Sequence, residues 1–279
     1  MNQYCFLNGK IIPLAEAKVS ILDIGLLRGY GIYDGLAVIN SKPLRFADHW
    51  QRFVRGARAL NIKVPITEEL AQKKITEIVD KSGFSNRINV RMILTGGQAI
   101  GGVEYNFQEP TFYMVAEEWE SLPKENYENG TKLITYSYKR EMPKLKTTNY
   151  IMAVNLQGLK KEQGAVEILY IHNSKVFECA TSNIFLVKNN TLITPEIDVL
   201  EGITRKIVLE LAEENYKIKK RGVHDRDLKS ADEVFITSSF KDIVPVIEID
   251  DFTVNSGKVG RVTKDLMDRL AQYIRLQTI

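Results

Sequence analysis

A lysine near the middle of the chain has a position that suits covalent catalysis. Lys146 lies in LKTTNY at residues 145–150, just before a helix that we expect to begin near Thr148. A lysine that forms a Schiff base must be neutral during part of each cycle. The positive N-terminal end of a helix lowers the pKa of a nearby lysine, so Lys146 is a candidate nucleophile. The alternative is a surface lysine, since Lys144 stands two residues away.

Other kinds of chemistry have little support in the residue spacing. His49, His172 and His224 stand singly, without the HxxxH or HxxE spacing of a metal site, so we expect no metal. No GxGxxG, GxxxxGKS/T or GxSxG pattern occurs, which disfavours a nucleotide-binding loop and a serine-hydrolase nucleophile. An enzyme with this sequence would therefore use a lysine, an organic cofactor, or both.

Five short patterns occur in the order typical of one enzyme family. They are DHWQRF at 48–53, LKTTNY at 145–150, FECATSNIF at 177–185, LEGITR at 200–205, and EVFITSS at 233–239 followed by IVPV. They resemble the HxxRL, lysine, EGxxSNIF and LxGITR motifs and a C-terminal strand of the class IV aminotransferases. The resemblance runs from about Phe6 to Ile274. It implies a pyridoxal-5'-phosphate (PLP) enzyme of fold type IV, similar to D-amino-acid aminotransferases, and a homodimer.

The resemblance also implies a role for each matching residue. Lys146 would carry PLP as a Schiff base, and Glu178 would keep the pyridine nitrogen protonated so that the ring accepts electrons. Arg52 would bind the phosphate. Tyr150 would bond the phenolic oxygen. The other cofactor-binding residues implied by the motifs are Ser182, Asn183, Gly202, Ile203, Thr204, Ser238 and Ser239.

Each of these roles has a structural alternative. Arg52 could be a helix-surface arginine, and Glu178 could be a solvated surface carboxylate. Thr204 could cap a helix, although the N–H groups of the same turn could bind phosphate as well. Tyr150 could be a core tyrosine, and the serines at 238 and 239 could simply begin a turn.

Two segments depart from the common family pattern and bear on the substrate. In LLRGYGIYDG at 26–35, Arg28 stands where an aromatic residue is usual, and TGG at 95–97 lacks the Arg of the usual TRG. Arg28 together with Arg91 resembles a less usual group of D-amino-acid aminotransferases. In that group two arginines bind the substrate carboxylate, the first from across the dimer. The alternatives are a loop salt bridge for Arg28 and an exposed strand position for Arg91.

The resemblance therefore implies transamination between an amino acid and a 2-oxo acid, with D-amino acids such as D-Glu or D-Ala favoured. A branched-chain L-amino-acid aminotransferase is the main alternative, because Arg91 and Tyr150 occupy positions used there too. Aminodeoxychorismate lyase is less favoured, since GGQAIGG does not match the loop of those lyases. A scaffold without cofactor is disfavoured because Lys146 and Glu178 are both present.

The elements that would position these residues alternate irregularly, which predicts an α+β fold with two α/β-type domains rather than a doubly wound sheet. Asn8-Gly9 should join two antiparallel strands. Apolar spacing predicts helices at 46–60 and at Glu68–Lys81, capped by Thr67 and ended by Gly83. Alternation over Arg87–Leu94 predicts a strand that presents Arg91 on its polar face.

The second half should contain a helix from about Asn149 to Gln163 and two hairpins. Further helices are expected from Thr204 to about Asn215 and at the C-terminus. The polar segment EEWESLPKENYENG shows neither helical nor strand periodicity, so it predicts a linker. We expect a small domain at 1–117, a linker at 118–130 and a large cofactor-binding domain at 131–279.

Composition limits the partners and the compartment. The 279 residues carry a net charge of +3 with basic and acidic side chains spread along the chain, so we expect neither a nucleic acid nor a membrane as partner. No apolar stretch is long enough for a membrane helix, and the N-terminus lacks the pattern of a signal peptide. Two widely separated cysteines, Cys5 and Cys179, predict no disulfide framework and fit a reducing cytoplasm.

Overall fold

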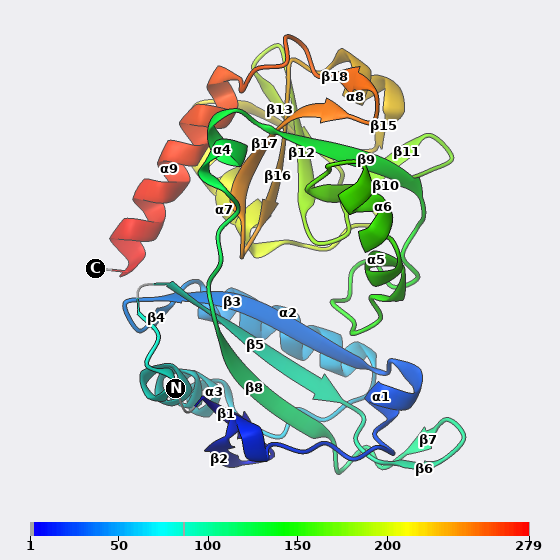
Figure 1. Ribbon diagram of the computed structural model, residues 1–279, viewed down its shortest axis with the longest axis vertical. Helices are drawn as coiled ribbons and strands as arrows, with labels where there is room; N and C mark the ends of the chain where they lie inside the picture. Colours follow the sequence, from blue (N-terminus) through cyan, green and yellow to red (C-terminus); the bar gives the residue numbers. More distant parts are fainter. Residues whose placement is uncertain (1–2, 86, 279) are drawn as a thin grey trace. The chain divides into compact units, whose positions relative to one another are not determined.

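The computed structural model describes residues 3–85 and 87–278. These residues form two compact units, each with its own sheet (Figure 1). The first unit contains Met1–Glu120, Leu145–Tyr150 and Gln277–Ile279, and the second contains Ser121–Lys144 and Ile151–Leu276. The first boundary falls inside the predicted linker 118–130. The short segment Leu145–Tyr150, which we expected within the large domain 131–279, groups with the first unit instead.

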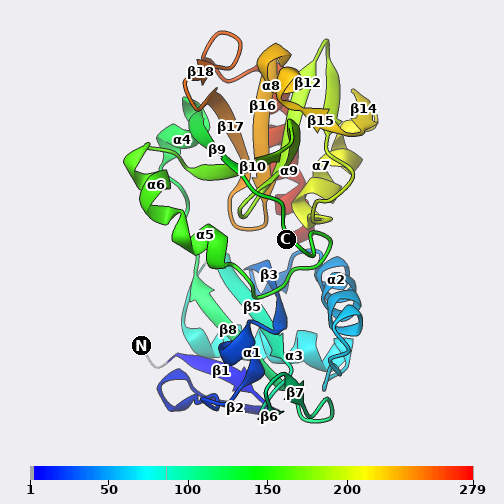
Figure 2. The same cartoon turned by 90° about the vertical axis from the view of Figure 1, so that its right-hand side faces the viewer.

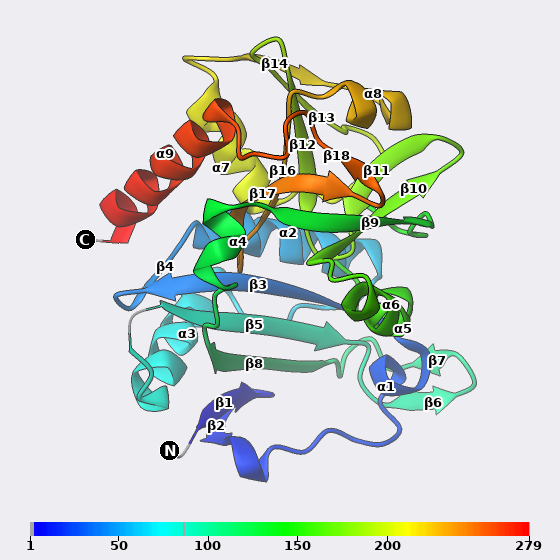
Figure 3. The same ribbon diagram turned by 45° about the horizontal axis from the view of Figure 1, so that its top comes forward.

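A six-stranded sheet forms the centre of the first unit, in the order β2-β1-β8-β5-β3-β4. Its strands are β1 (Tyr4–Leu7), β2 (Lys10–Pro13), β3 (Gly31–Ile39), β4 (Lys42–Pro43), β5 (Arg87–Thr95) and β8 (Thr111–Glu118). All neighbours pair antiparallel, and Figure 3 shows β3, β5, β8 and β1 side by side. The positive φ angles of Asn8 and Gly9 confirm the predicted tight turn between β1 and β2. A separate hairpin consists of β6 (Ala99–Gly101) and β7 (Glu104–Tyr105).

Two helices cover one face of this sheet (Figure 2). They are α2 (Phe46–Ala59) and α3 (Glu68–Ser82), and the short helix α1 (Ile24–Arg28) and the 3-10 turn η1 (Leu14–Glu16) complete the unit. The Thr67 hydroxyl accepts a bond from Leu70 N at 3.3 Å, and Gly83 ends α3 at φ 69°, so both predicted caps are confirmed. On β5, Val90 and Met92 face the helices and Arg91 lies on the opposite face, as the alternation predicted.

The second unit is built on a ten-stranded sheet, in the order β14-β13-β12-β16-β17-β9-β10-β11-β15 with β18 beside β17. Its strands are β9 (Thr131–Ser137), β10 (Glu167–His172), β11 (Lys175–Cys179), β12 (Asn183–Lys188), β13 (Thr191–Thr194), β14 (Lys217–Lys220), β15 (Val223–His224), β16 (Glu233–Ser238), β17 (Asp242–Ile249) and β18 (Phe252–Thr253). Its helices are α4 (Lys124–Glu128), α5 (Ile151–Asn155), α6 (Gln157–Glu162), α7 (Ile203–Ala212), α8 (Asp225–Ser230) and α9 (Arg261–Thr278). Residues of α7 and α9 pack around Phe185 and Phe235, whose rings stack with centroids 4.9 Å apart.

The predicted single helix from Asn149 to Gln163 was wrong. The chain forms two short helices instead, α5 and α6, and the first begins at Ile151 rather than near Thr148. The reason is that the preceding residues pair with a strand: Thr148 N donates to Gly31 O at 2.9 Å. That bond keeps the backbone extended where the helix was expected to start. Gly164 follows α6 at φ 63°, as expected for a residue that ends a helical segment.

Across the described ranges, none of the helices combines the length and the apolar character needed to cross a membrane.

Candidate active site

Lys146 lies on an extended segment that adds to the edge of the first unit's sheet. Tyr33 N donates to Lys146 O at 2.9 Å, and Thr147 forms an antiparallel bridge with Ile32. The Thr148 hydroxyl donates to Gly29 O at 3.0 Å. Backbone and side-chain bonds therefore fix the lysine on both sides against the start of β3.

The Lys146 side chain lies beside one tyrosine ring, and a second tyrosine packs against that ring. Its Nζ lies 4.5 Å from the centre of the Tyr33 ring, and Tyr33 packs edge to face against Tyr150 with centroids 5.5 Å apart. Arg91 opposes Gly35, two residues along β3 from Tyr33, so Arg91 and Tyr33 lie on the same face of the sheet. The structure thus places a lysine and two phenols together in the first unit, and Arg91 on the same sheet face as one of those phenols.

Arg52 belongs to a buried charged cluster on the helix side of β3. Its Nε and Nη2 each donate to an Asp34 carboxylate oxygen at 2.8 Å, and His49 Nδ1 lies 2.7 Å from Asp34 Oδ1. Asp34 is fully buried, and both partners are nearly so. The surface-helix alternative for Arg52 is therefore wrong, because α2 turns Arg52 inward toward β3.

Burial and charge act in opposite directions on this cluster. Burial favours a neutral Asp34, but the Arg52 guanidinium and the His49 ring hold the pKa of that carboxyl well below its usual range. Burial lowers the pKa of His49, and Asp34 only partly opposes this effect. The cluster is consequently an Asp34–Arg52 ion pair with a neutral imidazole whose Nδ1–H donates to the carboxylate.

Arg28 ends α1 with an exposed side chain, whose Nη1 donates to the neighbouring Leu27 O at 2.8 Å. The start of α1 is fixed by Asp23, a buried carboxylate that accepts Gly25 N at 2.7 Å and two threonine hydroxyls. Arg91 pairs with Glu117 at 3.0 Å.

Glu178 is a buried carboxylate in the second unit, which excludes the solvated alternative. Arg140 Nη1 donates to its Oε1 at 2.8 Å, and Leu200 N donates to its Oε2 at 2.9 Å. Asn183 Nδ2 lies 3.3 Å from the same Oε2 and 2.9 Å from Leu200 O. Donors on both oxygens fix the carboxylate in one orientation and stabilise its charged form.

The turn that opens α7 comes close to this carboxylate. Gly202 is the N-cap of α7 and has no side chain to cap the helix. The first N–H groups of an α-helix lack intrahelical partners. A Cβ at Gly202 would lie 1.9 Å from Asn183 Oδ1, so this approach requires glycine. Thr204 is not the N-cap; it lies buried in the first turn beside Ile203.

The two serine segments lie at ends of strands in the same unit. Ser182 precedes β12 and donates to Glu167 at 3.0 Å, whereas Ser238 ends β16 and accepts Lys241 N at 3.2 Å. Ser239 follows in the turn to β17. All three come from segments that the sequence motifs singled out.

Sequence reasoning missed three residues of these clusters: Tyr33, Asp34 and Arg140. Asp34 gave a usable signal, because a carboxylate inside the apolar run GIYDGLAVI needs a buried partner. Arg140 gave none, since it lies in a loop 38 residues before its partner Glu178.

Comparison with known proteins decides the family. The sequence family model of the class IV aminotransferases matches residues 31–249 of this chain. A Methanocaldococcus jannaschii protein provisionally named a branched-chain-amino-acid aminotransferase is 32% identical over 95% of this chain and 94% of its own. The D-alanine aminotransferase of Staphylococcus aureus strain COL is 30% identical over 98% of this chain and 99% of its own.

The chain belongs to the class IV aminotransferases. Its fold also matches a solved structure of the T.th. branched-chain amino acid aminotransferase with pyridoxamine 5'-phosphate. That match has a TM-score of 0.90 and 27% identity, and it covers 100% of this chain and 95% of the other. The fold-type IV architecture is thus confirmed, and the chain is a PLP-dependent aminotransferase.

Residues of the aminotransferase's second unit fit the phosphate of PLP. Thr237 Oγ1 is buried and has no hydrogen-bond partner among the described residues. Thr237 opposes Asn183 in the sheet, so both side chains lie on the face that packs against α7. An unpaired buried hydroxyl and the first N–H groups of α7 are donors of the kind that an anion requires.

Proposed function

We propose that the residues that the sequence motifs singled out hold PLP. In this proposal Lys146 is the covalent attachment point, Tyr150 bonds the phenolic oxygen and Glu178 pairs with the pyridine nitrogen. The phosphate would be bound by Arg52, Gly202, Ile203, Thr204, Ser238 and Ser239, and Ser182 and Asn183 would be further cofactor-binding residues. The observation that carries the proposal is the buried Glu178 carboxylate, held by Arg140 and Leu200 N. A charged carboxylate in a buried site suits a protonated pyridine.

PLP supplies a carbonyl carbon that exchanges amino groups and a ring that accepts the electrons released when Cα loses its proton. The residues would do the rest. Lys146 Nζ would move the Cα proton, and its fixed backbone would keep Nζ at the same place in each turnover. Glu178 would hold the proton on the ring nitrogen. Arg140 would keep Glu178 charged, because a guanidinium bond favours the carboxylate form.

Borohydride trapping tests the attachment point. Reduction of the yellow protein should fix the cofactor on the peptide containing Lys146, and Lys146→Ala should lower turnover by orders of magnitude. Lys144→Ala is the matched control and should keep both properties. Recovery of the label on Lys144 would refute the assignment.

For the substrate we propose D-amino acids such as D-Glu or D-Ala, with 2-oxoglutarate or pyruvate as acceptor. The support is Arg91, which lies on the same sheet face as Tyr33, and the exposed Arg28 at the end of α1. Branched-chain L-amino acids are the second candidate, because relatives of both kinds match nearly the whole chain. The α-carboxylate would displace Glu117 from Arg91, since both anions need the same guanidinium.

Single-turnover absorbance with D-Ala, D-Glu, L-Leu and L-Glu decides between the candidates. The fastest loss of the cofactor band should occur with a D-amino acid. Arg28→Ala and Arg91→Ala should each raise the KM for the amino acid. The increase should correspond to a loss of about 1.5–3 kcal/mol of binding free energy per charge-assisted bond removed. Faster reaction with L-Leu would favour the branched-chain candidate and leave the cofactor assignment intact.

We further propose a homodimer that acts in the cytoplasm. Large apolar side chains are exposed around α1 and the β6–β7 hairpin: Val19, Ile21, Leu22, Leu26, Leu27, Ile100, Val103 and Phe107. Ala99 N donates to Leu22 O at 2.9 Å, which joins the two segments into one patch. A patch of this kind favours a protein partner, and a second copy would place Arg28 at the interface. Both free cysteines are buried, in keeping with a reducing compartment.

Light scattering tests the dimer. Ile100→Asp should give monomers, and it should raise the KM for the amino acid if Arg28 acts across the interface. A change of the same kind outside the patch, Ile197→Asp, should leave the mass unchanged. A monomeric parent protein would refute the proposal.

A further inference from the structure

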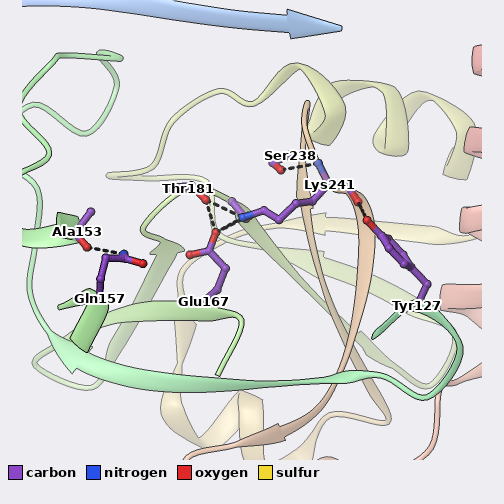
Figure 4. A network of polar contacts seen from close by, with 8 residues as sticks. Tyr127, Ala153, Gln157, Glu167, Thr181, Ser238 and Lys241 are labelled. Atoms are coloured by element: carbon purple, nitrogen blue, oxygen red, sulfur yellow. Dashed lines mark hydrogen bonds and ion pairs between the residues drawn. The ribbon is translucent and has the colours of Figure 1, made fainter. Parts of the chain in front are cut away.

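The second unit contains a buried ion pair that the proposed chemistry does not use. Glu167 at the start of β10 is 3% exposed and pairs with Lys241, which lies in the turn between β16 and β17 (Figure 4). Lys241 Nζ also donates to Thr181 Oγ1 at 2.7 Å. Glu167 Oε1 accepts further bonds from the hydroxyl groups of Thr181 and Ser182, the latter at 3.0 Å.

The charges of this cluster are fixed by its surroundings. Burial favours a neutral Glu167, but the Lys241 ammonium and the two hydroxyl groups hold the pKa of the carboxyl below its usual range. Glu167 is therefore a carboxylate with three donors on one oxygen. Such a group has a single preferred rotamer, because any other orientation would leave a buried charge without its partners.

The fixed orientation of Lys241 also constrains Ser238, a proposed phosphate ligand. Its backbone N donates to Ser238 Oγ at 3.2 Å, and Tyr127 donates to its carbonyl oxygen at 3.2 Å (Figure 4). A hydroxyl group that accepts one bond still has its hydrogen to donate. The orientation of Lys241 therefore sets the direction in which Ser238 can donate.

The cluster also joins two segments that carry proposed cofactor residues. Thr181 and Ser182 lie between Glu178 and Asn183, in the connection from β11 to β12, and Ser238 lies at the end of β16. Glu167 binds the first segment directly and the second through Lys241. Neither Glu167 nor Lys241 belongs to the motifs that indicated the family.

We propose that Lys241 and Glu167 are positioning residues for the cofactor phosphate, which fix the turn at Ser238 against the Thr181–Ser182 segment. This inference rests on the proposed function, in which Ser238 binds the phosphate. It assigns to a buried ion pair a role in phosphate affinity rather than in proton transfer. Loss of the pair should weaken the binding of PLP. It should leave the binding of pyridoxal unchanged, because pyridoxal has the same ring and aldehyde but no phosphate.

Absorbance titration of the cofactor-free protein with PLP and with pyridoxal tests the inference. Lys241→Met should raise the Kd of PLP at least tenfold, change the Kd of pyridoxal less than twofold, and leave kcat at saturating PLP within about twofold. Lys241→Arg should restore most of the PLP affinity. The matched control is Lys132→Met, which breaks a lysine–glutamate pair of 2.7 Å with Glu248 in the same unit and should change neither Kd.

A second variant, Thr181→Val, and the PLP binding of the parent protein separate failure of the positioning role from failure of the proposed function. If Lys241→Met does not fold, Thr181→Val removes one hydroxyl of the cluster without changing its charge and should raise the Kd of PLP about threefold. Equal losses for PLP and pyridoxal, or an unchanged Kd of PLP, would refute the positioning role alone. Failure of the parent protein to bind PLP would refute the proposed function as well.

Discussion

Acidification from pH 7.5 to 5.5 should destabilise the first unit through His49. The unfolded chain binds a proton on this histidine below its ordinary pKa of 6.5, whereas the folded chain keeps the buried ring neutral, with a lowered pKa. The unfolded state therefore gains protons that the folded state does not, and stability falls as the pH falls. Burial is the first cause of this shift, and the nearby charges of Arg52 and Lys146 add to it.

The size of the effect follows from the proton linkage. If the folded ring stays neutral at pH 5.5, one pH unit below its unfolded pKa, the free energy of unfolding should drop by about 1.4 kcal/mol relative to pH 7.5. The lowered pKa of Asp34 acts in a separate window. Its stabilisation is present above the ordinary carboxyl pKa and is lost only as the pH falls further, toward the folded value.

Urea unfolding followed by tryptophan fluorescence measures this quantity. Trp50 and Trp119 are the two tryptophans of the chain, and both belong to the first unit. His49→Asn keeps an amide donor for Asp34 but cannot titrate, so it should lose the drop of about 1.4 kcal/mol between the two pH values. An equal drop in the parent and in His49→Asn, with the same cofactor loading, would refute the reasoning.

Three other changes should have measurable effects. Asp34→Asn leaves the Arg52 charge buried and should cost about 3–5 kcal/mol in the same unfolding assay, whereas Asp232→Asn, in an exposed pair, should cost under about 1 kcal/mol. Arg140→Met should lower kcat at saturating PLP at least tenfold, and Arg140→Lys should recover part of this loss. If Arg140→Met had the same kcat as the parent protein, the role of Arg140 would be structural only. Gly202→Ala places a Cβ against Asn183 and should weaken PLP binding in an absorbance titration, whereas Gly158→Ala, with open space around it, should not.

Local patterns in the sequence predicted much of this molecule. The Asn8-Gly9 turn, the Thr67 and Gly83 caps and the alternation around Arg91 each depend on residues within a few positions of one another. Physical preferences of single residues decide such features, so they can be derived from the sequence. The motif around Glu178 likewise marked a residue that the structure places in a buried polar environment.

Features that depend on distant segments could not be derived in this way. The helix expected near Thr148 was wrong because this segment bonds to Gly29 and Gly31, the former 119 positions away. The Arg140–Glu178 pair likewise depends on how a loop without periodicity meets the end of β11. The partners in such a contact are far apart in the sequence and meet only when the sheets have formed, so neither residue predicts the other.

The short segment around Lys146 has a consequence for how the protein can be divided. The chain leaves the first unit at Glu120, returns to it for Leu145–Tyr150 and leaves again. A fragment that ended at Glu120 would lack the residues that complete the edge of β3 at Ile32 and Tyr33. A single proteolytic cut in the segment 121–130 should therefore leave two fragments that stay associated, because one of them still supplies a strand segment to the other's sheet. Neither compact unit is one continuous piece of sequence. A truncation or gene fusion that is meant to keep the first unit folded should therefore retain the segment Leu145–Tyr150.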